Sequence, residues 1–285
     1  MLAAVIMAVV GAGIGHAARR FAPKLARVKD EQGIRVPWPE VIGALLFGGA
    51  GWMIGFDPAR IPVYLYTAAF VGILVTDVRY KLIPDRITFP GAGIGIIASA
   101  IWPAWICSNF GQQAWLNALS MKADFAGGFA LGLVGAGLGF AAFEAMRRIM
   151  GRLFTMEVMG MGDSKLVMLM GAFLGPWGAL LGLFLAMICG VVTGVIYTRV
   201  FKTPHFPFGP ALALGGYLTM FWPSLVPGMM KAMQEYGASM HRGLFLAINL
   251  ALLGVAIWLM MRVRRRAKEY TDIIEKDYDR LEEED

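Results

Sequence analysis

Two aspartates at the edges of long apolar runs have the residue type and placement for chemistry. Asp77 closes an apolar run that begins at Pro62, and Asp163 opens another run. Ionisable residues at membrane depth are costly, so they are functional candidates. Two carboxylates that approach closely share a proton, so one can activate a water while its protonated partner polarises a peptide carbonyl. The pair therefore predicts peptide hydrolysis that needs neither a metal nor a nucleophilic side chain.

Each aspartate also has a purely structural interpretation. Asp163 follows Gly160 and Gly162, which could form a turn into a helix with Asp163 as its N-cap. Asp77 could be a snorkelling or ion-paired residue near Arg79 or Lys81. Glycines without a Cβ, however, let two backbones approach closely, as the binding of a peptide bond requires. Taken together, the two aspartates favour a catalytic pair.

The elements that must position this pair are membrane helices. Hydrophobic residues make up 58% of the 285 residues and charged residues 16%, against roughly 25% charged in soluble domains. Too little polar surface remains for a soluble bundle, and runs of about 20 apolar residues can each cross the bilayer. We therefore predict an all-α, polytopic transmembrane helical bundle of about eight to nine spans. The candidate spans lie near 2–18, 39–56, 62–78, 87–107, 125–145, 164–176, 177–198, 209–226 and 243–261, and the sixth and seventh could be one broken helix.

Positive charge predicts the orientation of these spans. With the N-terminus outside, 22 of the 26 Lys and Arg residues fall in cytoplasmic segments. Both aspartates and the C-terminus then lie on the cytoplasmic side, so the two carboxylates can meet at one depth. This distribution accounts for the net charge of +6, so we expect a lipid bilayer as partner and no nucleic acid.

Three further features of the chain predict no catalytic chemistry. Cys107 and Cys189 are far apart and form no CxxC pair, so neither a disulfide framework nor a metal site is predicted from them. The tail after the last span is basic and then acidic, which is typical of an anchor on anionic lipid followed by a solvated end; a partner-binding tail is the alternative. The first run, beginning at Met1, is interpreted as a retained span and not as a signal peptide.

Three motifs in this order resemble the type IV prepilin peptidases, intramembrane aspartic proteases of the GxGD type. The first is Asp77 followed six residues later by Ile83-Pro84-Asp85, and the second is Gly160-Met161-Gly162-Asp163-Ser164-Lys165-Leu166. The third is the proline- and glycine-containing stretch 206–215. Together the motifs cover roughly residues 62–226.

The resemblance implies residue roles and a substrate. Asp77 and Asp163 would be the catalytic aspartates, and the substrates would be prepilins or pseudopilins that lose a short basic leader after a glycine. Cleavage would occur on the cytoplasmic side of the bacterial inner membrane, with Asp85 and Glu157 as candidates to hold the basic leader. Lys165 would orient the loop, pair with anionic lipid or tune the dyad. The supporting motif residues are Gly160, Gly162, Lys165, Ile83, Pro84 and Asp85.

The N-terminal region departs from the pattern of many bifunctional members of this family. Their first cytoplasmic loop carries two CxxC pairs that bind zinc, whereas the loop here has about 20 residues and no cysteine, so we expect no zinc. Those members also methylate the new N-terminus with S-adenosylmethionine, and the missing loop puts that activity in doubt. Glu40 is the candidate residue for methylation or substrate binding. Its alternative role is that of a helix N-terminal carboxylate.

Three regions and several competing functions follow from this reading. We expect an N-terminal membrane region over 1–61, the peptidase domain over 62–226, and an extra span with a charged tail over 227–285.

A proton-coupled transporter would instead place its carboxylates near the bilayer midplane, and a non-catalytic assembly component would tolerate Asp→Asn changes. A GxGD protease acting on other signal peptides is the alternative within the same class.

Overall fold

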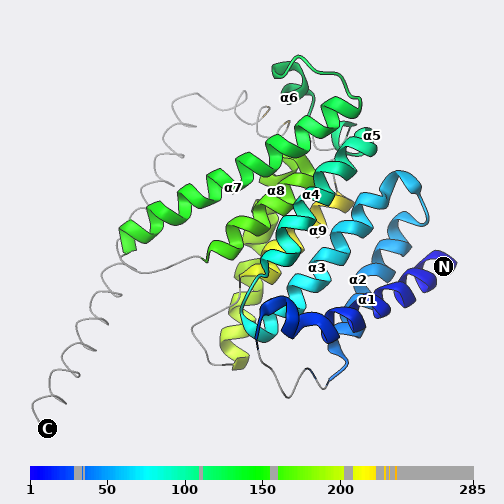
Figure 1. Cartoon of the computed structure of the whole chain (residues 1–285), viewed down its shortest axis with the longest axis vertical. Helices are drawn as coiled ribbons and strands as arrows, with labels where there is room; N and C mark the ends of the chain where they lie inside the picture. The colour runs from blue at the N-terminus through cyan, green and yellow to red at the C-terminus, as the bar shows by residue number, and fades with distance from the viewer. Residues whose placement is uncertain are drawn as a thin grey trace, which may run out of the picture. The chain divides into compact units, whose positions relative to one another are not determined.

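The computed structural model describes residues 1–28, 34, 36–108, 112–154, 160–201 and 208–222, with isolated residues at 228, 231 and 235. Over these residues the chain is helical and contains no strand, which confirms the predicted all-α class. Met1–Pro227 forms one compact unit and Gly228–Asp285 a second. The predicted last span 243–261 and the charged tail lie outside the described residues. The helices are α1 (Leu2–Ala26), α2 (Trp38–Ile54), α3 (Ile61–Tyr80), α4 (Asp85–Ile101), α5 (Pro103–Ser108), α6 (Gln113–Ala118), α7 (Phe125–Phe154), α8 (Met161–Phe201) and α9 (Gly209–Phe221), with a 3₁₀ turn η1 (Pro58–Arg60) before α3 (Figure 1).

Four of the described helical segments are long and apolar enough to cross a membrane. They are Leu2–Ala26, Pro58–Tyr80, Phe125–Ile149 and Met161–Thr193, and α2 is a shorter apolar helix. This confirms a polytopic helical bundle, while the total of eight to nine spans remains a prediction. The span predicted over 87–107 is wrong in one respect, because α4 ends at Ile101 and α5 begins at Pro103. A proline disfavours helical backbone in the residue before it, which here is Trp102.

The break predicted near Gly175 is confirmed, and it turns α8 back on itself. Gly175 has φ 67° and ψ −179°, a backbone conformation that favours glycine. A Cβ built on Gly182 would lie 2.6 Å from the Met170 sulfur. In an unbroken helix these two residues would be about 18 Å apart along the axis. The two halves of α8 therefore pack side by side (Figure 1).

Polar side chains from neighbouring elements satisfy the carbonyls that this break leaves free. Pro176 has no N–H, so the carbonyl of Ala172, four residues earlier, loses its helical partner. The Ser99 hydroxyl of α4 donates to that oxygen at 2.8 Å. The Gln112 side-chain amide donates to the Leu174 carbonyl, also at 2.8 Å. Both hydrogen bonds come from outside α8, so the turn is fixed by the bundle around it.

Small residues set the closest helix–helix contacts. A Cβ on Gly11 of α1 would overlap the carbonyl of Gly43 on α2, and a Cβ on Gly135 of α7 would overlap the carbonyl of Gly171 on α8. Membrane helices associate largely through such close backbone packing, because lipid tails supply little hydrophobic driving force between helices. The many glycines of the sequence thus hold α1 against α2 and α7 against α8.

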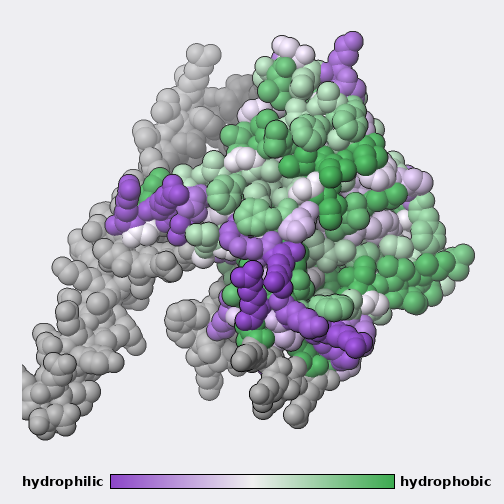
Figure 2. All heavy atoms as spheres, viewed as in Figure 1, coloured by the Kyte–Doolittle hydropathy of each residue, from purple (hydrophilic) through white to green (hydrophobic). Residues whose placement is uncertain are grey.

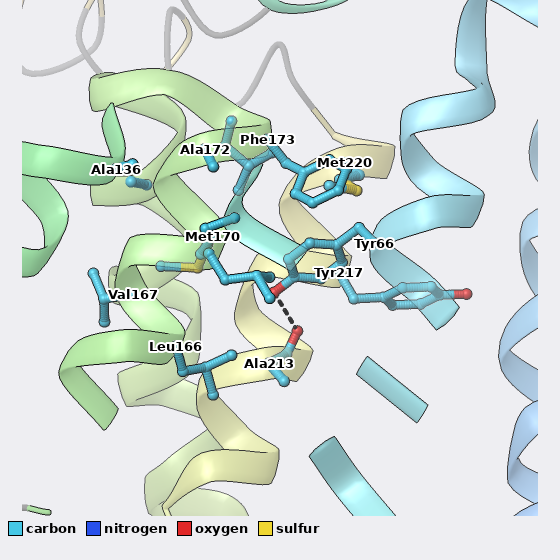
Figure 3. Close-up of a cluster of buried hydrophobic side chains, with 14 of the residues drawn as sticks. Tyr66, Ala136, Leu166, Val167, Met170, Ala172, Phe173, Ala213, Tyr217 and Met220 are labelled. Carbon is cyan, nitrogen blue, oxygen red and sulfur yellow. Dashed lines mark hydrogen bonds between the residues drawn. The ribbon is translucent and has the colours of Figure 1, made fainter. Parts of the chain in front are cut away.

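A buried cluster joins the helices that carry the two aspartates (Figure 3). Tyr66 of α3 packs edge-on against Phe173 of α8, with ring centroids 5.6 Å apart. The Tyr66 hydroxyl donates to the carbonyl of Ala213 on α9 at 3.1 Å. A Cβ on Gly216 of α9 would overlap that same hydroxyl. These contacts fix α3, α8 and α9 relative to one another.

Charged residues gather where several helix ends meet. The Arg86 guanidinium at the start of α4 donates to the Lys24 carbonyl near the end of α1, at 3.1 Å. Lys165 at the start of α8 pairs with Asp85 at the start of α4. Figure 2 shows hydrophilic residues concentrated over this part of the surface and over the end of α7, while most of the remaining visible surface is apolar. The helix ends predicted to be cytoplasmic therefore lie at one end of the bundle.

Candidate active site

Asp77 and Asp163 lie close enough to interact electrostatically, although 86 positions separate them in the chain. Asp77 is in the last turn of α3 and Asp163 in the first turn of α8. Both are buried, with 6% and 9% of their surface exposed, and Asp163 acts electrostatically on Asp77. Carboxylates are rarely buried without a purpose, because the charged form loses its hydration. The structure thus brings the two predicted residues together.

The structure bears on the snorkelling interpretation of Asp77 and on the N-cap interpretation of Asp163, whereas an ion pair of Asp77 with a neighbouring cation stays a prediction. A snorkelling side chain would reach water, whereas Asp77 is buried and its neighbours Arg79 and Lys81 are exposed. The N-cap interpretation of Asp163 is also wrong, because α8 begins at Met161 and Asp163 is already its third residue. Its carboxylate accepts a backbone hydrogen bond from Gly160.

Gly209, the first residue of α9, contacts the carboxylate of Asp77. Its main chain makes a backbone hydrogen bond with that carboxylate, and a Cβ at this position would lie 2.5 Å from Asp77 Oδ2. Asp77 Oδ2 itself is buried and accepts no hydrogen bond within the described part of the chain. A buried oxygen without a partner is uncommon in native proteins and often marks a functional group. Gly209 belongs to the third motif, whose residues Phe206 and Pro207 lie outside the described residues.

The segment between α3 and α4 covers the dyad from another side. It begins with Lys81 at φ 52°, whose N–H donates to the carbonyl of Asp77 at 2.8 Å. It ends at Pro84, which precedes the first residue of α4. A Cβ on Gly162 would lie 3.0 Å from Ile83 Cβ, and a Cβ on Gly209 would lie 3.0 Å from Ile83 Cδ1. Ile83 therefore fills the space between the starts of α8 and α9.

Lys165 and Asp85 join the starts of α8 and α4. The Lys165 Nζ lies 2.5 Å from Asp85 Oδ1 and 5.5 Å from the centre of the Phe89 ring. The Lys165 side chain is 14% exposed and that of Asp85 is 59% exposed. The Lys165 ammonium group thus contacts the Asp85 carboxylate and the Phe89 ring. The exposed part of the Asp85 side chain remains accessible to solvent. Glu157, the other acidic candidate for leader binding, lies outside the described residues.

Glu144 is a site neighbour that the sequence analysis missed. It lies on α7 with only 7% of its surface exposed and forms a two-point ion pair with Arg147, at 2.7 and 2.8 Å. Arg148 adds a third contact at 3.0 Å. The hydroxyl of Ser164, next to Asp163, donates to Glu144 Oε2 at 3.3 Å. The sequence did contain a signal for this ion-pair cluster. At the end of an apolar run, Glu144 precedes Arg147 by three positions and Arg148 by four, a spacing that places the side chains on one face of a helix.

Glu40 belongs to a different pair of helices. It lies in the first turn of α2, and its Oε1 contacts His16 Nδ1 and Arg19 Nε of α1, both at 3.1 Å. Its second oxygen, Oε2, is buried and has no hydrogen-bond partner among the described residues. Within that same part of the chain, no group of three or more His, Cys, Asp or Glu side chains is placed to hold a metal ion.

Comparisons with known proteins agree with the motif resemblance. Residues 63–195 match the sequence model of the Type IV leader peptidase family. A "Prepilin leader peptidase/N-methyltransferase" of Xanthomonas campestris is 29% identical over 203 residues, which are 70% of this chain and 63% of the relative. A protein with the same description from Stutzerimonas stutzeri is 30% identical over 193 residues, 66% of this chain and 58% of the relative. A "Type 4 prepilin-like proteins leader peptide-processing enzyme" of Escherichia coli is 29% identical over 191 residues, 67% of this chain and 62% of the relative.

The coverage of these relatives is partial. The chain spans less than two thirds of the length of each of the three, at 63%, 58% and 62%. No solved structure matches the chain significantly.

Proposed function

We propose that this chain, whose residues 63–195 match the Type IV leader peptidase family, is a membrane-embedded aspartic endopeptidase that removes the short basic leader of type IV prepilins or pseudopilins. The observation that carries the proposal is the burial of Asp77 and Asp163 within electrostatic reach of each other, with Gly209 against Asp77, within the family motifs. Cleavage occurs after a glycine at the end of the leader.

The two carboxylates perform the hydrolysis as a pair that shares one proton. The ionised carboxylate takes a proton from a water, whose oxygen forms a bond to the carbonyl carbon of the scissile peptide. The protonated carboxylate donates to the carbonyl oxygen and stabilises the developing charge. The tetrahedral intermediate then loses the C–N bond while a proton passes to the leaving nitrogen. Asp77 Oδ2 has no hydrogen-bond partner among the described residues, so we assign the water to this oxygen.

Gly162 and Gly209 support the approach of an extended substrate backbone. A Cβ at either glycine would meet Ile83, and one at Gly209 would also meet Asp77 Oδ2, so the missing side chains let the main chain of α8 and α9 come close to the dyad. A peptide bond must come within about 3–3.5 Å of the attacking atom. Backbone walls without a Cβ permit that distance.

The site operates on the cytoplasmic face of the bacterial inner membrane, with the N-terminus outside and the C-terminus inside. This follows from the 22 Lys and Arg residues in the segments at that side. The leader is basic, and the exposed carboxylate of Asp85 lies near the dyad to attract it. The lipid bilayer holds the apolar helix that follows the leader in the substrate.

N-methylation of the new N-terminus is a second proposed activity, and the buried oxygen of Glu40 is the observation that favours it. Glu40 Oε2 lacks a partner among the described residues, so it could accept a hydrogen bond from the ammonium group of S-adenosylmethionine, while Arg19 could pair with that ligand's carboxylate. S-adenosylmethionine would supply the methyl group. No step of the hydrolysis depends on this second site.

The test of the peptidase is cleavage of a prepilin-like substrate by the purified protein in detergent, with product masses as the readout. The wild type should release the leader after glycine, and Asp77→Asn and Asp163→Asn should each lower the rate at least about 100-fold, because general acid–base groups contribute that much. Asp57→Asn, a change at an exposed aspartate before η1, is the matched control and should leave the rate unchanged. Normal cleavage by a folded Asp163→Asn variant would refute the proposed mechanism.

The same assay separates the remaining alternatives. A product heavier by one methyl group in the presence of S-adenosylmethionine supports methylation, and its loss in Glu40→Gln assigns the residue. A folded wild type that cleaves no prepilin but cleaves other signal peptides supports the alternative protease. If it cleaves nothing, proton uptake into vesicles tests the transporter.

A further inference from the structure

Glu144 is a buried ionisable residue that the proposed hydrolysis does not use. It lies on α7 within the candidate span Phe125–Ile149. Arg147 donates to both of its carboxylate oxygens, and Arg148 contacts Oε1 at 3.0 Å. Ionisable side chains inside membrane helices are costly and commonly functional. A carboxylate bound by an arginine fork of its own helix has a defined orientation, so Glu144 can hold a group of another helix in place.

The group that Glu144 contacts on α8 is the hydroxyl of Ser164. This hydroxyl is buried and donates to Glu144 Oε2 at 3.3 Å. The contact continues the close packing of α7 against α8, because a Cβ on Gly139 would lie 3.1 Å from the carbonyl oxygen of Val167. Ser164 directly follows Asp163 in the chain. The ion-pair cluster of α7 is therefore joined to the residue next to a member of the dyad.

Two contacts restrain the rotation of the first turn of α8. Successive residues of a helix point about 100° apart, so Asp163, Ser164 and Lys165 face three directions. Ser164 bonds to α7, and Lys165 pairs with Asp85 of α4. The Asp85 side chain is 59% exposed, and exposed ion pairs contribute little. The buried contact of Ser164 with Glu144 is therefore the stronger restraint of the two.

We propose that Glu144 is a positioning residue of the hydrolysis, which sets the Asp163 carboxylate through Ser164; this inference rests on the peptidase function proposed above. Catalytic groups must be held within about 0.5 Å and 10–20° of their productive geometry. A rotation of the first turn of α8 moves the Asp163 carboxylate relative to the other aspartate of the dyad. Loss of the contact should therefore slow the chemical step and leave substrate binding unchanged.

The experiment measures kcat and KM separately, on a prepilin-like substrate, together with the thermal unfolding midpoint. Ser164→Ala removes the donor and should lower kcat about 10-fold with KM unchanged, as part of the roughly 100-fold loss that a 1 Å misplacement causes. Glu144→Gln keeps the size of the side chain but loses the charge, which makes such hydrogen bonds about twice as strong, so kcat should fall here too. The double variant should lose no more than the weaker of the two single variants, because both act through one contact.

Ser99→Ala is the matched control. Ser99 is also a buried serine whose hydroxyl donates to α8, at the carbonyl of Ala172 and 2.8 Å. Ala172 lies nine positions after Asp163, about 14 Å further along the helix. This variant should lower the unfolding midpoint and leave kcat unchanged, so it separates a general loosening of α8 from a displacement of Asp163.

Each outcome supports or overturns the positioning role. An unchanged kcat in folded Ser164→Ala overturns it, and so does an equal fall of kcat in Ser99→Ala. If the losses of the two single variants multiply in the double variant, Ser164 and Glu144 act separately and the inference is wrong. If one of the two single variants does not fold, the other decides. If the wild type cleaves nothing, the proposed function fails and the inference with it, whereas a failure of the positioning role alone leaves wild-type cleavage intact.

Discussion

Gly209 shows how much the geometry of the dyad depends on a residue without a side chain. Asp77 and Asp163 could be selected from the sequence, because each stands at the edge of an apolar run within a motif. The contact of Gly209 with Asp77 could not, since it depends on the path of α9 relative to α3. Glu144 was missed for a related reason, because its burial comes from the packing of α7 against the start of α8.

At the scale of residues, we predict that Gly209→Ala lowers the rate of cleavage about 100-fold while the protein stays folded. The new Cβ would lie 2.5 Å from Asp77 Oδ2, so either the carboxylate or the start of α9 must shift. A misplacement of about 1 Å in an active site can lower the rate about 100-fold. The measurement is kcat/KM for a prepilin-like peptide together with the thermal unfolding midpoint.

Gly93→Ala is the control for this substitution. Gly93 is a helical glycine of α4, and a Cβ there would meet no atom within 4 Å. Alanine favours helix over glycine by about 1 kcal/mol, so this variant should keep full activity and unfold at the same or a higher temperature. Equal activity of the two alanine variants would contradict the close approach of α9 to Asp77.

At the scale of elements, the break in α8 determines how the helix of Asp163 is positioned. The Gly175-Pro176 pair made a break predictable from the sequence, because proline removes a hydrogen bond and glycine permits positive φ. The direction of the turn was not predictable. It depends on hydrogen bonds from Ser99 and Gln112, which lie 73 and 62 positions from the carbonyls that they bind.

We predict that Gln112→Leu destabilises the protein by about 1–3 kcal/mol, the cost of leaving a buried carbonyl without its partner. The carbonyl concerned is that of Leu174, which accepts from Gln112 at 2.8 Å. The matched control is Gln113→Leu, because Gln113 is exposed and, among the described residues, its side chain bonds to Asn117 within α6. Unfolding monitored by circular dichroism in detergent should show a lower midpoint for Gln112→Leu alone. Equal midpoints in the two variants would show that the turn does not need this hydrogen bond.

At the scale of the whole molecule, the charged helix ends and the dyad lie at the same end of the Met1–Pro227 unit. The distribution of Lys and Arg along the sequence predicted that these helix ends lie on the same side of the membrane. Basic residues resist translocation and therefore remain in cytoplasmic segments. The sequence did not predict which helices pack against each other, because lipid-facing and buried apolar residues have the same composition. The contacts between small residues, such as Gly135 with Gly171, decide the neighbours instead.

The orientation is tested on the two ends of α3 in a chain whose Cys107 and Cys189 are replaced by serine. Single cysteines are introduced at Asp57, just before η1, and at Lys81, just after α3, both exposed positions. With the N-terminus outside, a membrane-impermeant thiol reagent should label Asp57→Cys in intact cells and Lys81→Cys only after the inner membrane is opened. The reverse pattern would place Asp77 and Asp163 on the outer face. The basic leader of a prepilin, held inside the cell, could not then reach the dyad, so the proposed substrate would be wrong even if both aspartates proved to be catalytic.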